Sequence, residues 1–204
     1  MAGGNICGYL RPRQNVQCRE PNEIVMNKFK IALFTTILLG ALPLMAQEKV
    51  NSTGGKSPHE TTSAMVGGNR VTLVYGRPYM KGREIWGKLV PYDKVWRTGA
   101  DEATLLITQK SIVIGETTVP AGAYTLRTLP AADGSAKLII NKQIGQWGVG
   151  PGSYDEKQDL ARVDLKKDTL DTPVEEFTMT VTPNGELQMS WDKTKYSVAF
   201  TVQK

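Results

Sequence analysis

Two runs near the C-terminus alternate apolar and polar residues with a period of two. Their apolar members are Phe177, Met179 and Val181 in the first run and Leu187, Met189 and Trp191 in the second. This period is typical of β-strands that bury one face. Asn184 and Gly185 lie between the runs and predict a tight hairpin, because both residues tolerate positive φ angles. A third one-faced run, residues 196–202, follows the polar residues 192–195, so the pattern predicts a three-stranded antiparallel meander.

Six shorter apolar runs precede the meander, and Gly, Pro, Asp or Asn bounds each of them. They cover residues 71–75, 103–108, 111–115, 123–128, 137–141 and 161–165. Short runs punctuated in this way predict the strands of an all-β domain. The apolar face of the meander needs a second sheet to cover it, so we expect residues 70–204 to form a single antiparallel β-sandwich of the jelly-roll or Greek-key kind. A closed β-barrel is the alternative.

Residues 26–46 have the three parts of a secretory signal peptide. Lys28 and Lys30 precede an apolar run, and Ala46 supplies a small residue at the expected cleavage point. The run is shorter than the roughly 20 apolar residues that span a bilayer, so no permanent membrane anchor is expected. Residues 1–25 read as an upstream extension that is not native to the protein. We therefore expect a periplasmic or secreted protein.

The residues after the predicted signal peptide exclude several chemistries. Both cysteines, Cys7 and Cys18, precede it, and the one histidine, His59, falls in residues 47–69, a Gly/Ser/Thr-rich stretch that reads as a polar tether. A histidine-based catalytic triad and a zinc site are therefore not expected, and the sequence suggests no cofactor. Oxygen-only calcium binding by acidic residues within 155–159 stays open.

The charge balance also narrows the choice of partners. The net charge is +5 for the whole chain, but after residue 46 the chain has 20 Lys/Arg and 18 Asp/Glu, a net charge of +2. No basic block remains in that part, so nucleic acid is not an expected partner. The sequence names no protein partner.

Residues 75–104 form a long irregular segment rich in Lys, Arg, Gly and Trp. In one interpretation, the arginines pair with nearby carboxylates, and Trp86 and Trp96 are buried anchors of a long loop. In the other, the same cations grip a carboxylate, sulfate or phosphate, and an indole face stacks on a sugar. Long irregular loops on a rigid scaffold are typical binding sites, so both interpretations stay open.

The same segment carries a resemblance to a known family. It reads "YGRPYMKGREIWGKLVPYDKVWRTGADEAT" and is followed by "VPAGAYTLRTLP", "LIINKQIGQWG", "YDEKQDLARVDL" and "VEEFTMTV". Together these stretches resemble the DUF2911 family over about residues 65–202. The resemblance implies an exported domain of unknown function from Bacteroidetes-type bacteria, and it supplies no activity, cofactor or catalytic residue.

The positions that match the family pattern and have no evident backbone role are the candidate ligand-binding residues. They are Arg77, Lys81, Arg83, Trp96, Arg97 and Glu102, and Trp147 is added as a second aromatic wall. The favoured function is a non-enzymatic β-sandwich that binds a small polar ligand, a carbohydrate or an anionic glycan, through residues 75–104. The alternatives are a hydrolase that uses Glu102 with a second carboxyl group, and a structural or interaction module of the cell envelope.

Overall fold

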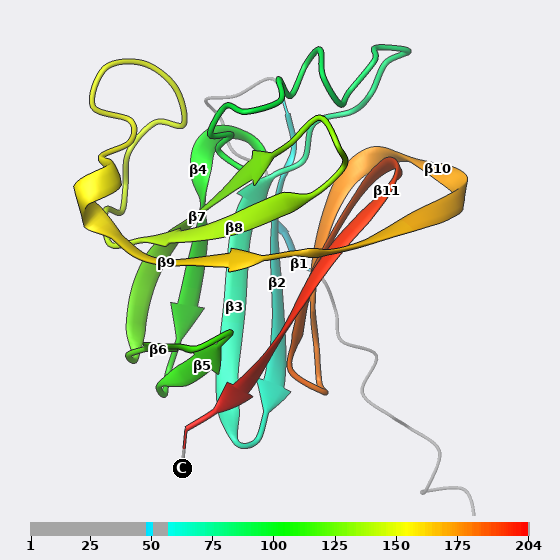
Figure 1. Ribbon diagram of the computed structural model, residues 1–204. Helices are drawn as coiled ribbons and strands as arrows, with labels where there is room; N and C mark the ends of the chain where they lie inside the picture. The colour runs from blue at the N-terminus through cyan, green and yellow to red at the C-terminus, as the bar shows by residue number, and fades with distance from the viewer. Residues whose placement is uncertain (1–47, 51–56, 204) are drawn as a thin grey trace, which may run out of the picture. The chain divides into compact units, whose positions relative to one another are not determined.

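Antiparallel strands build two separate sheets in the computed structural model, which describes residues 48–50 and 57–203 (Figure 1). One sheet has seven strands in the order β1-β2-β3-β4-β7-β8-β9, and the other has four in the order β10-β11-β5-β6. The strands are β1 (Glu48–Val50), β2 (His59–Val66), β3 (Asn69–Gly76), β4 (Ala100–Thr108), β5 (Ile112–Ile114), β6 (Thr117–Val119), β7 (Gly122–Pro130), β8 (Ala136–Asn141), β9 (Asp159–Asp164), β10 (Lys166–Thr182) and β11 (Glu186–Val202). A short 3-10 helix, η1 (Glu156–Gln158), precedes β9.

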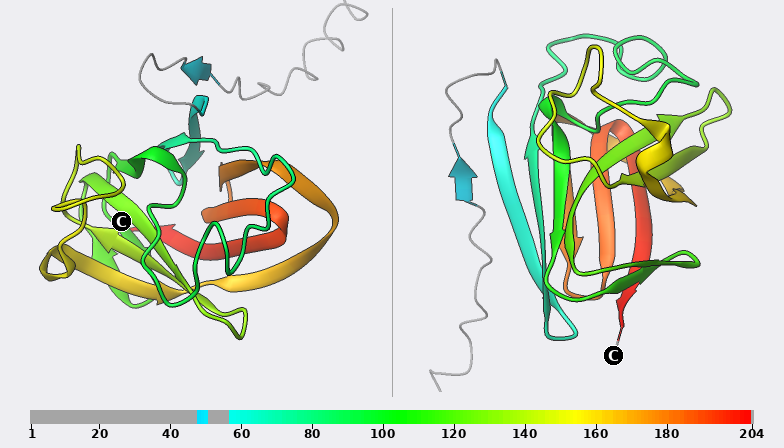
Figure 2. Two further views of the ribbon diagram at one scale, coloured as in Figure 1. Left: turned by 90° about the horizontal axis from the view of Figure 1, so that it is seen from above. Right: turned by 90° about the vertical axis from the view of Figure 1, so that its left-hand side faces the viewer.

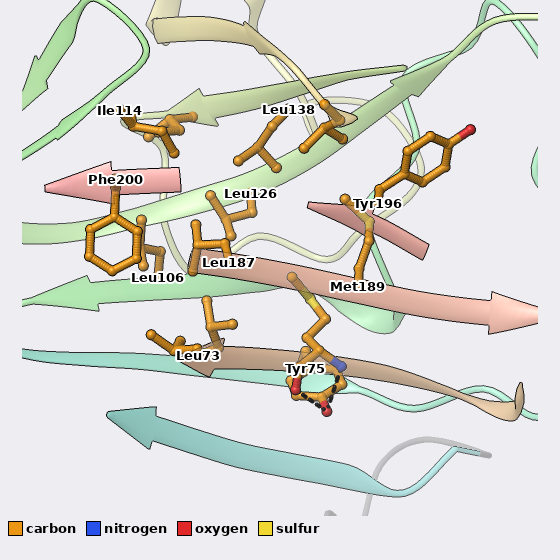
Figure 3. Packing of buried hydrophobic residues seen from close by; sticks show 14 of the residues in the cluster. Leu73, Tyr75, Leu106, Ile114, Leu126, Leu138, Leu187, Met189, Tyr196 and Phe200 are labelled. Atoms are coloured by element: carbon orange, nitrogen blue, oxygen red, sulfur yellow. Dashed lines mark hydrogen bonds between the residues drawn. The ribbon is translucent and has the colours of Figure 1, made fainter. Parts of the chain in front are cut away.

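The two sheets share one apolar interior, because alternate residues of each strand point inward. The seven-stranded sheet contributes Leu73, Leu106, Leu126 and Leu138, and the four-stranded sheet contributes Ile114, Leu187, Met189 and Phe200 (Figure 3). The rings of Tyr75 on β3 and Phe177 on β10 meet edge to face, with their centroids 5.9 Å apart. Two sheets packed face to face confirm the predicted antiparallel β-sandwich over the closed barrel within the described residues.

The predicted C-terminal meander has two strands instead of three. Strand β11 runs without a break from Glu186 to Val202, and residues 192–195, which were expected to turn the chain, lie within it. Asp192 has a φ of 50°, and the pairing of β10 with β11 shifts register beside it. Aspartate tolerates this angle in a β-bulge as well as in a turn, so the same local signal has two structural outcomes. The hairpin at residues 184–185 is confirmed.

Residues 59–66, expected in the polar tether, form strand β2 and pair residue by residue with β3. The tether prediction was therefore wrong for this part of the chain. The inward side chains of β2 include Glu60 and Thr62, which are 1 % and 6 % exposed. These two polar residues interrupt the apolar alternation that reveals the other strands. Glu60 is tolerated inside because the guanidinium of Arg77 lies 2.6 Å from its carboxylate.

The predicted upstream extension, residues 1–25, and the predicted signal peptide, residues 26–46, lie outside the described residues. Their roles, and the periplasmic or secreted location, stay predictions. Over the part of the chain that the structure describes, no helix has both the length and the apolar character needed to cross a membrane.

Residues 77–99 connect β3 to β4 and pass over one end of the sandwich (Figure 2). We call this segment the crossover loop. Isolated β-bridges fasten it at two points, from Tyr79 to Glu176 of β10 and from Trp96 to Thr128 of β7. The loop therefore contacts both sheets, which holds it in a defined position despite its irregular backbone.

Candidate functional site

Arg77 is fully engaged with neighbouring protein groups. Its guanidinium lies 2.6 Å from Glu60 Oε2 and 3.2 Å from Glu176 Oε2. It also donates hydrogen bonds to the Phe177 carbonyl at 3.1 Å and to Thr178 Oγ1 at 2.8 Å. Its side chain is 11 % exposed. This arrangement is the internal clamp of the first interpretation, and it joins the crossover loop to β2 and β10.

Trp96 belongs mainly to an aromatic cluster under the crossover loop. Its ring stacks on Trp191 with centroids 5.9 Å apart and an interplanar angle of 16°. It meets Phe177 at 5.1 Å and Trp86 at 6.1 Å, both edge to face. Trp96 is 8 % exposed. The cluster anchors the loop to the core, and Trp96 and Trp191 still contribute to the wall of the neighbouring cleft.

A cleft of about 390 Å³ lies between the crossover loop and the first residues of β4. Four of the candidate residues line it: Lys81, Arg83, Trp96 and Arg97. The remaining lining residues are Ser57, Pro78, Tyr79, Leu89, Gly99, Ala100, Asp101 and Trp191. Three cationic side chains thus share the cleft with the single carboxylate of Asp101, and we call it the cationic cleft.

Arg97 is the most unusual of these cations. Its side chain makes no hydrogen bond or ion pair with any described residue, and its Nε is buried without a partner. Burial lowers the pKa of Arg97, and the nearby carboxylate of Asp101 offsets part of this effect. Gly148 packs against it so closely that a Cβ at Gly148 would overlap the Arg97 side chain. A half-buried guanidinium that is neither hydrogen-bonded nor in a close ion pair is unfavourable unless something else satisfies it.

Local backbone strain positions the residues on either side of this arginine. Thr98 and Asp101 have φ angles of 58° and 63°. Positive φ is costly for a β-branched residue such as Thr98, because its Cβ crowds the backbone. Thr98 is held by its hydroxyl, 2.8 Å from that of Thr128, and its carbonyl accepts a hydrogen bond from the Thr104 hydroxyl. The strained turn places Arg97 and Asp101 together in the cleft lining.

Lys81 and Arg83 form the exposed rim of the cleft. The backbone N–H of Lys81 donates to Glu175 Oε1 at 2.8 Å, which fixes a residue whose φ is 50°. The guanidinium of Arg83 donates to the carbonyls of Met80 and Tyr79, at 2.9 Å and 2.5 Å. The first contact ties Lys81 to β10 and the others tie Arg83 to its own loop, and none of them pairs either side-chain charge with a carboxylate.

The model of a protein family of unknown function, DUF2911, matches residues 57–200, which is more than half of the chain. The chain belongs to the DUF2911 family. Neither a curated protein nor a solved structure matches it. Every residue that lines the cationic cleft lies inside the matched DUF2911 region.

Like Arg77, the candidate residues Glu102 and Trp147 of this DUF2911 domain lie outside the cleft lining. Glu102 Oε2 is 2.7 Å from His59 Nε2, and the Glu102 side chain is 54 % exposed. Partial burial acts to raise the pKa of Glu102, but a hydrogen bond from its own backbone N–H and one from His59 outweigh it, so the pKa is lowered. Trp147 forms an isolated antiparallel β-bridge with Glu102 and is 49 % exposed.

The DUF2911 domain also contains a buried charged residue, Arg127, that is not among the residues predicted from the sequence. Arg127 on β7 is 2 % exposed, although it points to the outer face of its sheet. Its guanidinium donates to the carbonyls of Gly148 and Ser153 and lies 5.1 Å from the centre of the Tyr154 ring. Burial lowers the pKa of Arg127, and the neighbouring Arg97 adds to this effect. Its neighbours come from a distant loop, so nothing near Arg127 in the sequence indicates its burial.

The acidic residues considered as calcium ligands make ion pairs and hydrogen bonds within the domain. Arg162 forms ion pairs with Asp159 at 2.7 Å and with Glu156 at 2.8 Å. The side chain of Asp155 accepts a hydrogen bond from the Lys157 backbone and caps η1. Within the described residues, no group of three or more His, Cys, Asp or Glu side chains is arranged to hold a metal ion.

Proposed function

We propose that this DUF2911 domain binds a small anionic ligand in the cationic cleft, and that a carboxylate- or sulfate-bearing sugar is the class that fits best. The observation that carries the proposal is the half-buried guanidinium of Arg97, which lacks a hydrogen-bond or ion-pair partner among the described residues. An anion would supply the missing charge and hydrogen bonds, and guanidinium groups suit carboxylates and sulfates well.

The size and lining of the cleft support a sugar-sized ligand. Its volume of about 390 Å³ lies near the lower end of the range for small-molecule pockets. Lys81 and Arg83 at the rim can attract an anion from solution, while Trp96 and Trp191 offer apolar surface beneath it. The strained backbone at Thr98 supports the same location, because strain of this kind clusters at functional sites.

Binding without catalysis is the version of the function that we favour. A glycosidase needs two carboxyl groups that face each other across the substrate, and Asp101 is the one carboxylate in the cleft lining. The alternative acid, Glu102, lies outside that lining and has a lowered pKa, whereas a general acid needs a raised one. The hydrolase alternative therefore has no support from Glu102.

Isothermal titration of the full chain with sodium glucuronate and with glucose tests the proposal. Glucuronate is expected to bind and glucose to bind much more weakly, because they differ in the carboxylate. Replacing Arg97 by Gln should weaken glucuronate binding about ten- to hundredfold, since a hydrogen bond to a charged group contributes about 1.5–3 kcal/mol. Arg70→Gln is the matched control, because Arg70 is exposed and lies outside the cleft lining. Equal binding of both sugars, or unchanged binding by Arg97→Gln, would contradict the proposal.

A second candidate function, an interaction module, is favoured by apolar side chains in the connection between β8 and β9. Ile144, Trp147 and Val149 are 56 %, 49 % and 56 % exposed. Side chains of this kind on one loop can bind another protein surface. Sedimentation velocity of the wild type and of Trp147→Ser tests self-association. A concentration-dependent larger species that Trp147→Ser removes would support this function, and a monomer in both cases would argue against self-association.

A further inference from the structure

A second cavity, of about 260 Å³, adjoins the cationic cleft. Leu89, Trp96 and Arg97 belong to the lining of both cavities. Trp96 is buried, but Leu89 is exposed and Arg97 is half-buried. The boundary between the two cavities therefore includes side chains that reach the molecular surface, and a ligand can pass over them from one cavity into the other.

The second cavity lies between the crossover loop and the connection from β8 to β9. The crossover loop supplies Lys94, and the connection supplies Gly148 and Val149. The Gly148 backbone N–H donates to the Asp101 carbonyl at 3.0 Å, and the Gly148 carbonyl accepts a hydrogen bond from Arg127 at 3.5 Å. These bonds hold the connection against β4 and β7, so the cavity is formed before any ligand arrives. We call it the Lys94 cavity.

The charge of the Lys94 cavity continues that of the cationic cleft. Lys94 is exposed, and no described aspartate or glutamate lines the cavity. The side chains of Lys94 and Arg97 make no hydrogen bond or ion pair with any residue that the structure describes. On the other side of Arg97, Lys81 and Arg83 line the cationic cleft. Anionic groups are therefore favoured on both sides of Arg97.

The guanidinium of Arg97 can serve both cavities at once. Among its three nitrogen atoms, Nε is the one that is buried without a partner in the described part of the chain. The two Nη atoms also lack a partner there but are not buried, so they keep surface that a ligand can reach. A guanidinium presents its donors in a planar fork. Arg97 can therefore bind an acid group in the cationic cleft and still donate to an oxygen atom of a neighbouring sugar.

We infer that the ligand is an acidic oligosaccharide of at least two sugar units, with an acid group on each of two neighbouring units. This inference rests on the proposed function of the cationic cleft. One unit lies in the cationic cleft with its acid group on Arg97, and the next unit lies in the Lys94 cavity with its acid group near Lys94. The exposed side chains of Leu89 and Val149 offer apolar contact to the C–H faces of the sugar rings.

Isothermal titration of the full chain with sodium galacturonate and with sodium digalacturonate tests the inference. The two compounds contain the same acid unit and differ in the number of units. Digalacturonate is expected to bind roughly tenfold more tightly, which exceeds the roughly twofold statistical gain from a second identical unit. The additional gain comes from the contacts of the second unit in the Lys94 cavity.

Replacing Lys94 by Gln locates the second unit. This change removes the charge and keeps much of the side-chain length. It should weaken digalacturonate binding about fivefold, while galacturonate binding changes less than about twofold. Lys88→Gln is the matched control, because Lys88 is an exposed lysine of the same loop that lines neither cavity. It should change the binding of neither compound.

The outcomes separate this inference from the function on which it rests. If galacturonate binds and digalacturonate binds no more tightly than the statistical gain allows, the inference is overturned and the anion site stands. Digalacturonate binding that Lys94→Gln leaves unchanged has the same meaning. If neither compound binds, the proposed function fails together with the inference.

Discussion

Arg77 and Glu60 form a buried ion pair, with 2.6 Å between the guanidinium and a carboxylate that is 1 % exposed. The Tyr75 hydroxyl lies 3.1 Å from the same carboxylate oxygen, and burial raises the pKa of Tyr75, so the hydroxyl stays protonated. Glu176 adds a second carboxylate 3.2 Å from Arg77. A charged cluster of this kind ties the start of the crossover loop to β2 and β10, and it leaves no open face of Arg77 for a ligand.

Removing the Arg77 charge should therefore damage the fold. Arg77→Met is expected to lower the free energy of unfolding by about 3–5 kcal/mol, because it leaves a buried carboxylate without its partner. Arg83→Met is the control, since Arg83 is exposed and should change stability by no more than about 0.5 kcal/mol. Urea denaturation measures both values. Similar values for the two variants would show that the buried pair is not a structural clamp.

Lys81 has separate effects on stability and on binding. Its φ of 50° is unfavourable for lysine, and asparagine adopts this region more readily. Lys81→Asn should therefore raise the free energy of unfolding by up to about 1 kcal/mol while it weakens glucuronate binding. Lys88→Asn, at another exposed lysine of the crossover loop but outside the cleft lining, should change neither quantity appreciably. A Lys81→Asn variant that loses stability would contradict the strain that we assign to this position.

Gly148 and Arg97 should be energetically coupled. A Cβ at Gly148 would overlap the Arg97 side chain and would lie 2.7 Å from the Asp101 carbonyl. Gly148→Ala is expected to cost about 1–3 kcal/mol of stability by overpacking. Adding Arg97→Ala removes one of the two clashes, so the double variant should recover part of that loss. Thermal and urea unfolding of the two single variants and the double variant give the coupling, and purely additive losses would argue against the close packing.

The Glu102 and His59 pair should make stability depend on acid pH. The pKa of Glu102 is lowered in the folded protein. The ionised Glu102 therefore contributes its full share to the free energy of unfolding above the ordinary glutamate pKa of about 4.3. This contribution is lost as the pH falls through the lower pKa that Glu102 has in the folded protein. Because the side chain is 54 % exposed, solvent screening keeps this contribution below about 1 kcal/mol. Urea denaturation of wild type and Glu102→Gln should differ at pH 6 and converge at pH 3, and a constant difference would count against the pair.

The sequence predicted strands wherever the inward side chains are apolar, as at Phe177 and Leu187. Strand β2 was not predicted, because its inward residues Glu60 and Thr62 are polar. Glu60 is tolerated in the interior because it pairs with Arg77 of the crossover loop. An ion pair between two separate segments produces no periodic pattern in the sequence of either segment. The bulge at Asp192 was predicted as a turn, because aspartate tolerates a positive φ angle in both features.

The composition of residues 75–104 singled out a cationic segment, and the structure brings Lys81, Arg83 and Arg97 together in one cleft. Their common loop explains why the sequence could group them. Arg77 belongs to the same loop, but Glu60 and Glu176 draw it into the interior, and both come from other strands.

The order of the four-stranded sheet sets when it can assemble. Strand β11, residues 186–202, lies between β10 and β5, so of the four strands of this sheet the one translated last is an inner strand. Neither β10 nor the β5–β6 hairpin finds its neighbour until β11 has been synthesised. The four-stranded sheet therefore cannot be complete before the residues of β11 have been translated, so β10 and the β5–β6 hairpin lack their common neighbour until then.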